Sequence, residues 1–262
     1  MSTELSKLFS LEGRKAIVIG GGSGIGAAIA KGLAAYGADT AIASRNLDKL
    51  KEMAAEIEKE IGKKIRTYQV DVSSEESIKA LVEKTRAEWG IVDILVNSQG
   101  LNHKFLAEEM PMDEWDAMYA VNVRGVFICC KEFAKGMIEQ KYGKIINVGS
   151  IGAERTSTAG ISVCYSSSKG AVKTMTMNLA AGWAKHNITV NAVNPILTPT
   201  PMMKEVFEKD PAKKASVLSR NPMGRMGEPE DCVGMAIYFA SDASSFVTGQ
   251  GLCPDGGLLT LQ

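Results

Sequence analysis

The sequence has few of the residues that build metal sites and disulfide frameworks. Histidine occurs only twice, as His103 and His186, and neither stands at a metal-ligand spacing from another ligand. The five cysteines are an odd number and include no Cys-x-x-Cys pair, so we interpret all five as reduced thiols. We therefore predict no metal site and a cytoplasmic location.

An excess of charge and a long apolar run are also missing. Thirty Lys and Arg residues balance thirty Asp and Glu residues, which gives no reason to expect a nucleic-acid or membrane-surface partner. No apolar run is long enough to span a bilayer, and residues 1–13 lack the apolar core of a signal peptide. What remains is an ordinary globular composition, with 45% hydrophobic residues.

The sequence does contain a regular alternation of short apolar runs and helical segments along all 262 residues. No linker, repeat or low-complexity tract interrupts it. This alternation predicts one α/β domain over 1–262, a single doubly wound parallel sheet of the Rossmann type with helices on both faces. The predicted strands are 15–19, 40–43, 65–70, 93–96, 143–148, 188–193 and 249–253.

Two predicted helices, at 112–140 and 163–185, are apolar around most of their circumference. A helix of this kind is buried on two sides, so one side can face the sheet and the other suggests a contact between subunits. The segment at 197–226 is rich in Lys, Pro and Met, and we predict that it forms a lid over the site.

A glycine-rich turn lies between the first predicted strand and the first predicted helix. Glycines let a backbone approach a pyrophosphate, and a helix N-terminus offers free N–H groups and a positive dipole end. A flexible loop is the alternative, but the placement favours dinucleotide binding. The predicted contacts are Gly20, Gly22, Ser23, Gly24, Ile25 and Gly26.

The residues after the second predicted strand indicate which dinucleotide is bound. NAD-preferring folds place an acidic residue there, whereas this chain has Ser44, Arg45 and Asn46. An acid would repel a 2′-phosphate, but a hydroxyl, a guanidinium and an amide can hydrogen-bond to it. We therefore predict NADP(H). The alternative is that Arg45 only extends into solvent.

Further candidates follow the other strands, because ligands bind at the carboxyl ends of parallel strands. For Asp71, a role as the N-cap of the helix at 75–89 is nearly as plausible as a ligand contact. For Ser150, the alternative is turn chemistry. The predicted cofactor contacts at these ends are Asp71, Val72, Asn97, Gln99, Gly100, Pro195 and Thr198, and Ser150 is the candidate for the substrate.

The predicted helix at 163–185 carries Tyr165 and Lys169, which are four residues apart and so share one helix face. A neighbouring ammonium favours a phenolate, which lowers the pKa of the tyrosine and suits it to general acid–base catalysis. The pair alone is weak evidence, since it occurs often by chance.

Taken in order, these motifs resemble those of the classical short-chain dehydrogenases/reductases over essentially the whole chain. The resemblance implies that Tyr165 is the acid/base for the substrate oxygen, and that Lys169 lowers its pKa and holds the nicotinamide ribose. Ser150 would hydrogen-bond to the substrate oxygen, and Asn122 would position a water that links Lys169 to solvent. Tyr165 and Lys169 are therefore also predicted to contact the cofactor.

The resemblance also implies a homotetramer that assembles through the two apolar helices at 112–140 and 163–185. Three positions depart from the family pattern: Ile19 replaces a threonine, Gln99 replaces an alanine, and Ile196 replaces a glycine. These departures concern the geometry of the cofactor loops rather than the catalytic residues.

The predicted substrate is a small molecule. His103, Arg155 and Ser150 are its candidate contacts, and the polar and basic residues of these loops suit a hydroxyl-rich or carboxylated compound, although they could equally be solvated loop residues. The chain is similar to members of the family that act on sugars, polyols and sugar acids, gluconate 5-dehydrogenase-like enzymes among them. The alternatives are a 3-oxoacyl-carrier-protein reductase, a hydroxysteroid-type dehydrogenase and a non-catalytic NADP-binding sensor.

Overall fold

The computed structural model describes residues 5–155, 160–196, 198, 209–210, 215 and 218–261. Within these residues, seven strands form one sheet in which every pairing is parallel, in the order β3-β2-β1-β4-β5-β6-β7. This confirms the predicted doubly wound α/β fold. The strands are β1 (Lys15–Ile19), β2 (Asp39–Ser44), β3 (Ile65–Gln69), β4 (Ile94–Asn97), β5 (Gly143–Val148), β6 (Ile188–Val193) and β7 (Gly251–Leu252).

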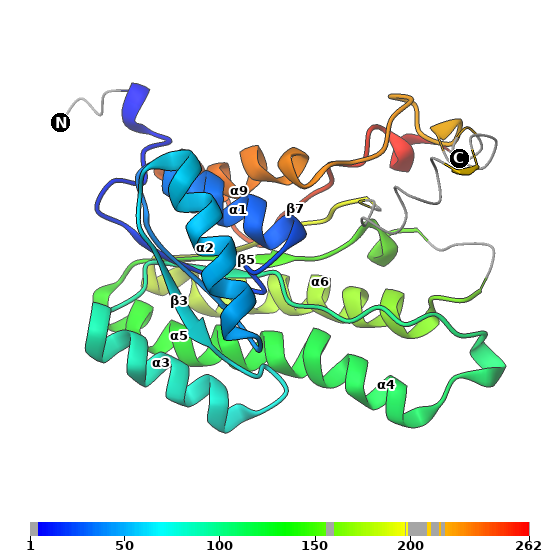
Figure 1. The fold of residues 1–262 in the computed structure, drawn as a ribbon, viewed down its shortest axis with the longest axis horizontal. Helices are drawn as coiled ribbons and strands as arrows, with labels where there is room; N and C mark the ends of the chain where they lie inside the picture. Colours follow the sequence, from blue (N-terminus) through cyan, green and yellow to red (C-terminus); the bar gives the residue numbers. More distant parts are fainter. Residues whose placement is uncertain are drawn as a thin grey trace.

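Helices cover both faces of this sheet (Figure 1). On one face lie α1 (Gly24–Ala35), α2 (Leu47–Ile61) and α9 (Val233–Ala240), and on the other lie α3 (Glu75–Trp89), α4 (Met112–Tyr119), α5 (Val126–Gln140) and α6 (Val163–Trp183). Each face has its own apolar core. Central strands such as β1 and β4 are buried on both faces, so they read as continuous apolar runs rather than as alternating ones.

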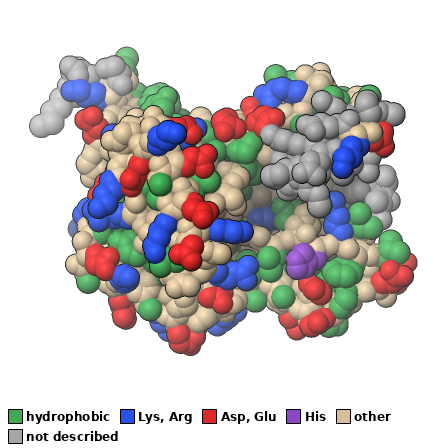
Figure 2. All heavy atoms as spheres, in the orientation of Figure 1, with side chains coloured by type: hydrophobic (Ala, Val, Ile, Leu, Met, Phe, Trp, Pro, Cys, Tyr) green, Lys and Arg blue, Asp and Glu red, His purple; other side chains and the backbone are tan. Residues whose placement is uncertain are grey.

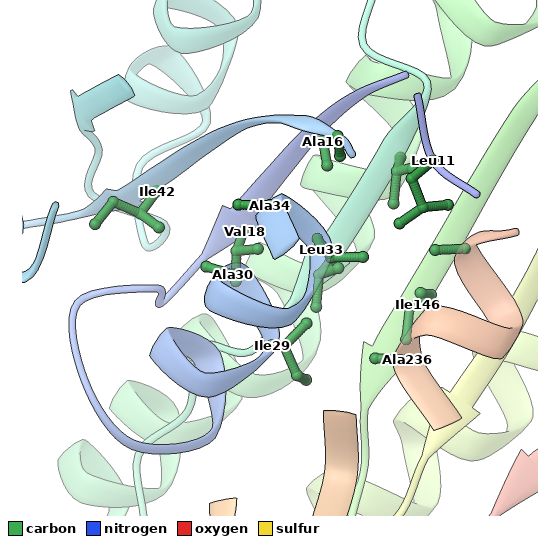
Figure 3. Close-up of a cluster of buried hydrophobic side chains, with 14 of the residues drawn as sticks. Leu11, Ala16, Val18, Ile29, Ala30, Leu33, Ala34, Ile42, Ile146 and Ala236 are labelled. Carbon is green, nitrogen blue, oxygen red and sulfur yellow. The ribbon is translucent and has the colours of Figure 1, made fainter. Parts of the chain in front are cut away.

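The first core joins α1 and α9 to the middle of the sheet. Figure 3 shows Ile29 and Leu33 of α1 facing Ile146 of β5 and Ala236 of α9. This packing holds α1, and with it the glycine-rich turn that precedes it, in a fixed position over the ends of β1 and β4.

The helix predicted over 112–140 is interrupted by a π-helical turn at Ala120–Gly125. The hydrophobic pattern gives no sign of this turn, because a wider turn keeps the chain helical. The helix predicted over 163–185 ends at Trp183 and continues as a 3₁₀ turn. The predicted last strand is shorter than expected, with only Gly251 and Leu252 paired to β6.

Most of the lid predicted at 197–226 lies outside the described residues. Its described end is anchored to the start of the following helical segment, where Nη1 and Nη2 of Arg225 each donate a hydrogen bond to the carboxylate of Asp231 at 2.7 Å. Asp231 also accepts a hydrogen bond from the backbone N–H of Glu228. In the part of the chain that the structure describes, none of the helices is both long and apolar enough to cross a membrane.

Candidate active site

The carboxyl ends of the central strands bring the predicted site residues to one edge of the sheet. The glycine-rich turn follows β1, Gly100 lies just after β4, and Ser150 follows β5, and these three strands are neighbours. In open parallel sheets, ligands bind at this edge where the strand order reverses, here between β1 and β4. Figure 2 shows a hollow in this region, to the right of α2 and above α6 as they lie in Figure 1.

The glycine-rich turn has the geometry of a phosphate cradle. Gly20 and Gly24 have φ values of 80° and 54°, which favour glycine. A Cβ at Gly26 would lie 2.3 Å from the carbonyl oxygen of Gly20, so no larger residue fits there. Ser23, the N-cap of α1, makes no capping hydrogen bond to a described residue, which leaves the first N–H groups of the helix for an anion.

Ser44, Arg45 and Asn46 lie beside this turn. Ser44 ends β2, and its Oγ is 3.5 Å from the position that a Cβ of Gly22 would take. Asn46 Oδ1 accepts a hydrogen bond from the backbone N–H of Lys49 and so caps α2, which leaves its NH₂ group for a ligand. Arg45 is exposed, and a guanidinium here can pair with a 2′-phosphate.

The interpretation of Asp71 as an N-cap is wrong, because Ser74 caps α3 by accepting a hydrogen bond from the backbone N–H of Ser77. Asp71 Oδ1 instead accepts two hydrogen bonds from Ser73, at 2.9 and 2.7 Å. These bonds hold the pKa of the Asp71 carboxyl below its ordinary value. The carboxylate therefore stays ionised and oriented at the end of β3, and the adjacent Val72 is buried.

The two amide residues at the end of β4, Asn97 and Gln99, are buried in the protein. Asn97 is 1% exposed, and its Nδ2 donates to Asn147 Oδ1 at 2.9 Å and to Cys130 Sγ at 3.2 Å. A contact of Asn97 with a cofactor can therefore involve only its backbone. Gln99 is also buried, and its Nε2 donates to Asn97 Oδ1 at 3.4 Å.

Ser150 and Tyr165 form a hydrogen-bonded pair at the end of β5. Ser150 Oγ also accepts a hydrogen bond from the backbone N–H of Gly152 at 3.0 Å, which fixes the position of the hydroxyl. Burial raises the pKa of Tyr165, and the hydrogen bond with Ser150 partly opposes that effect. At neutral pH the phenol therefore carries its proton.

Lys169 lies one turn further along α6 and is buried. Its Nζ donates to the carbonyl oxygen of Val148 at 2.9 Å and is 5.7 Å from the centroid of the Tyr165 ring. Burial lowers the pKa of Lys169 to about 8. The prediction that Lys169 lowers the pKa of Tyr165 is not what this structure shows. The Lys169 ammonium donates to the backbone carbonyl of Val148, and burial is the largest cause of the pKa shift of both residues.

Asn122 lies in the π-helical turn and is fully buried. Its Oδ1 accepts from the N–H of Leu101 at 2.7 Å, and its Nδ2 donates to the carbonyl of Leu101 and to Ser168 Oγ. It thus joins the loop after β4 to α6, one residue from Lys169. Gly125 permits this packing, since a Cβ there would lie 2.5 Å from the carbonyl oxygen of Val72.

The family resemblance predicted Asn122 as the residue that positions a water beside Lys169, but nothing in the sequence pattern indicated the π-helical turn or the role of Gly125. Helical turns of this kind frequently occur at functional sites. The π-helical turn lets Asn122 point at the loop after β4 while α5 continues along the sheet. An unbroken α-helix would rotate Asn122 away from that loop.

The candidate substrate residues are not all directed at the same point. His103 Nδ1 is 2.5 Å from Glu114 Oε2 of α4, a partner that the sequence did not suggest. Arg155 donates to the carbonyl of Leu258 at 3.0 Å, so it ties the loop after β5 to the C-terminal segment. Among the three candidates, Ser150 is the one that contacts Tyr165.

The loops after β5 and β6 also contact each other. The carbonyl oxygen of Pro195 accepts a hydrogen bond from the N–H of Ile151 at 3.2 Å. Thr198 Oγ1 donates to the carbonyl of Ile196 at 3.3 Å. Pro195 therefore lies beside the segment that carries Ser150, as a residue that borders the site must.

Comparisons with known proteins agree with this geometry. A family model described as enoyl-(acyl carrier protein) reductase matches residues 20–259. Gluconate 5-dehydrogenase of Gluconobacter oxydans (strain 621H) is 36% identical over 251 residues, which cover 96% of each chain. 3-Oxoacyl-[acyl-carrier-protein] reductase of Thermotoga maritima is 36% identical over 249 residues, which cover 95% of this chain and 99% of that protein.

A solved structure with the same fold adds a bound state. The crystal structure of a gluconate 5-dehydrogenase from Burkholderia cenocepacia J2315 in complex with NADP and tartrate is similar to this chain, with a TM-score of 0.91 and 34% identity. The match covers 98% of this chain and 99% of that one.

Proposed function

Because this chain belongs to the short-chain dehydrogenase/reductase family, we propose that it is an NADP(H)-dependent oxidoreductase that interconverts a secondary alcohol and a ketone on a small sugar acid. The observation that carries the proposal is the group formed by the buried Ser150 and Lys169 and the half-buried Tyr165 beside the glycine-rich turn. The gluconate 5-dehydrogenases among the similar proteins support the sugar-acid class over other polar substrates such as polyols.

The residues present fit a dinucleotide. Gly26 leaves no room for a side chain against Gly20, whereas a Cβ on Gly24 would meet no described atom within 4 Å, so the turn is closed on its inner side and open on its outer side. The N–H groups of α1 and Ser23 would hold the pyrophosphate, and Arg45 with Ser44 would hold the 2′-phosphate. When bound, NADP(H) supplies or accepts the hydride.

The remaining chemistry is proton transfer by this chain's own residues. Ser150, held by the N–H of Gly152, donates a hydrogen bond to the substrate oxygen and orients it. Tyr165 gives its proton to that oxygen as the ketone is reduced, and takes it back when the alcohol is oxidised. Lys169, whose Nζ donates to the carbonyl of Val148, would hold the nicotinamide ribose of a bound cofactor. The raised pKa of Tyr165 suits the phenol to act as the acid.

A substrate panel tests this proposal. We expect NADPH oxidation with a keto-hexonate, and NADP reduction with the matching aldonate, at kcat/KM values at least about tenfold above those for polyols, steroids or 3-oxoacyl thioesters. Higher activity on 3-oxoacyl thioesters would favour the second candidate. NADPH binding with no turnover on any member of the panel would favour a non-catalytic sensor.

The second candidate, a 3-oxoacyl-carrier-protein reductase, is favoured by the Thermotoga maritima relative. Such an enzyme docks an acidic carrier protein, so it needs a basic surface beside the site. Figure 2 shows acidic and basic side chains interspersed on the face around the hollow, and the chain has no net charge. These features support a small substrate rather than a carrier-bound one.

Arg45→Ala tests the choice of cofactor. The lost charge-assisted hydrogen bonds should raise the Kd for NADPH roughly 10- to 100-fold, while the Kd for NADH should change less than about twofold, because NADH has no 2′-phosphate. Titration of both cofactors by fluorescence gives the two values. Lys51→Ala, a neutralisation on the exposed face of α2, is the matched control. Equal weakening of both cofactors by Arg45→Ala would remove the 2′-phosphate argument.

We also propose that the chain forms a homotetramer through the helices around α4, α5 and α6. Large apolar side chains are exposed on these helices. They are Met112, Phe127, Val163 and Met177, which are between 43% and 64% exposed. Burying them in a subunit contact would remove apolar surface from water. Light scattering that gave the mass of a single chain would contradict the proposal.

A further inference from the structure

A row of buried polar side chains runs beneath the site from α6 to Gln99. Asn147 Nδ2 donates to Thr176 Oγ1 at 2.9 Å, Asn97 Nδ2 donates to Asn147 Oδ1 at 2.9 Å, and Gln99 Nε2 donates to Asn97 Oδ1 at 3.4 Å. The four residues are between 0% and 7% exposed. Polar groups buried this deeply are expected to have all their hydrogen bonds satisfied.

Thr176 sets the direction of the whole row. Its hydroxyl proton is donated to the carbonyl of Val172 in its own helix, so its oxygen must accept from Asn147. Each amide then gives its NH₂ group to the next residue toward α6 and accepts with its carbonyl oxygen. The amide of Gln99 must follow the same order, with Nε2 facing Asn97 and Oε1 facing away from the row.

That outward oxygen is the one open end of the row. Gln99 Oε1 is buried and has no hydrogen-bond partner among the described residues. Leaving an amide oxygen in this state is unfavourable unless a donor completes it. Gln99 lies two residues after β4, at the edge of the sheet where the site is built, so the groups of the site are the candidate donors.

Lys169 is the donor at that edge with N–H groups to spare. It precedes Thr176 by seven residues on α6, so the two lie on one face of the helix, about two turns apart. A Cβ on Gly100, the neighbour of Gln99, would lie 3.7 Å from Lys169 Nζ and 3.5 Å from Asn122 Oδ1.

The other amide nearby has no N–H group left to give. Both protons of Asn122 Nδ2 are donated, to Leu101 and Ser168. Lys169 Nζ has three protons, and one of them is donated to Val148.

We propose that Gln99 is a positioning residue for Lys169. One buried water accepts a hydrogen bond from the Lys169 ammonium and donates one to Gln99 Oε1. The inference rests on the proposed function only in taking Lys169 as part of the catalytic group. The carbonyl dipole of Gln99 presents its negative end to the ammonium, so it favours the charged form of Lys169 and opposes the effect of burial.

Few other ionisable groups face Lys169 in the described structure. Tyr165 lies one turn before it on α6, and Ser150 contacts Tyr165 from the loop after β5. The thiol of Cys130 on α5 touches the polar row, but burial raises its pKa to about 12, so it stays neutral. Burial is the influence that the structure gives for the pKa of Lys169, with no carboxylate among its causes.

The experiment measures the titration of Lys169 in the protein without cofactor, by NMR of ¹³C-labelled lysine, with the signal assigned from the spectrum of Lys169→Met. We expect the midpoint, about 8 in the wild-type chain, to fall by about half a pH unit or more in Gln99→Met, which keeps the length of the side chain and removes the acceptor. Gln99→Glu should move the midpoint upward, because a carboxylate favours the ammonium more strongly than an amide does.

Thr176→Val is the matched control, because it breaks the far end of the row and leaves Oε1 in place. It should lower the thermal stability and leave the midpoint of Lys169 unchanged. The proposal would be overturned if neither Gln99→Met nor Thr176→Val changed the midpoint of Lys169. It would also be overturned if both variants shifted that midpoint equally. If Gln99→Glu does not fold, the comparison of Gln99→Met with Thr176→Val still tests the proposal. A catalytically inactive wild-type protein would contradict the proposed function without affecting this measurement.

Discussion

Tyr165→Phe should abolish turnover and leave both the fold and NADPH binding intact. The substitution keeps the half-buried ring and removes only the hydroxyl that hydrogen-bonds with Ser150. Since general acid–base catalysis contributes roughly 10²- to 10⁴-fold to a rate, we expect kcat to fall by at least about two orders of magnitude. Steady-state kinetics on the substrate that the panel identifies give this value, and NADPH titration gives the Kd, which should change less than about threefold.

Tyr119→Phe is the control for this change. The Tyr119 hydroxyl donates to Ser167 Oγ at 3.1 Å on the partly exposed side of α4, so the same atom is removed outside the proposed catalytic group. Its kcat should equal that of the wild-type chain. Full activity in Tyr165→Phe would mean that another group moves the proton, and the mechanism built on Tyr165 would then be wrong.

The fold could be predicted from the sequence because the physics of a parallel sheet is visible in single segments. A strand covered by helices on both faces has to be apolar along its length, as Ile94–Val96 is, and a helix that packs on one face is not. The order of the strands is a property of the whole sheet, and single segments do not determine it. What the pattern did not contain is the π-helical turn at Ala120–Gly125, which leaves the hydrophobic periodicity nearly unchanged.

The positions of the site residues could also be predicted, because residues that follow parallel strands must meet at one edge. Their bonding could not be predicted. Asp71 and Ser74 are both good N-cap residues, and only the backbone geometry selects Ser74. Whether Asn97 faces the cofactor or Asn147 depends on the side of the strand it occupies. The pKa of Tyr165 depends on burial, which the spacing to Lys169 does not determine.

The last prediction concerns Lys169→Met, which should remove activity and make the stability of the protein less dependent on pH. Lys169 has an ordinary pKa of 10.5 in the unfolded chain and about 8 in the folded one. Between these values the unfolded chain binds more protons, so the stability of the wild-type protein rises with pH over this window. The gap corresponds to on the order of 3 kcal/mol, which is the cost of burying the ammonium below pH 8.

Methionine has a similar length and no charge, so Lys169→Met avoids that cost but leaves the carbonyl of Val148 without its donor, which costs roughly 1–3 kcal/mol at every pH. At pH 7 the variant should therefore be as stable as the wild-type chain or more stable, by up to about 2 kcal/mol, and this advantage should shrink as the pH rises from 8 toward 10. Urea unfolding across that range measures the difference. Lys173→Met, one turn further along α6 and exposed beside Glu154, should show no such trend. A stability difference for Lys169→Met that stayed constant from pH 7 to pH 10 would contradict the prediction. It would mean that burial does not lower the pKa of Lys169 in the folded protein.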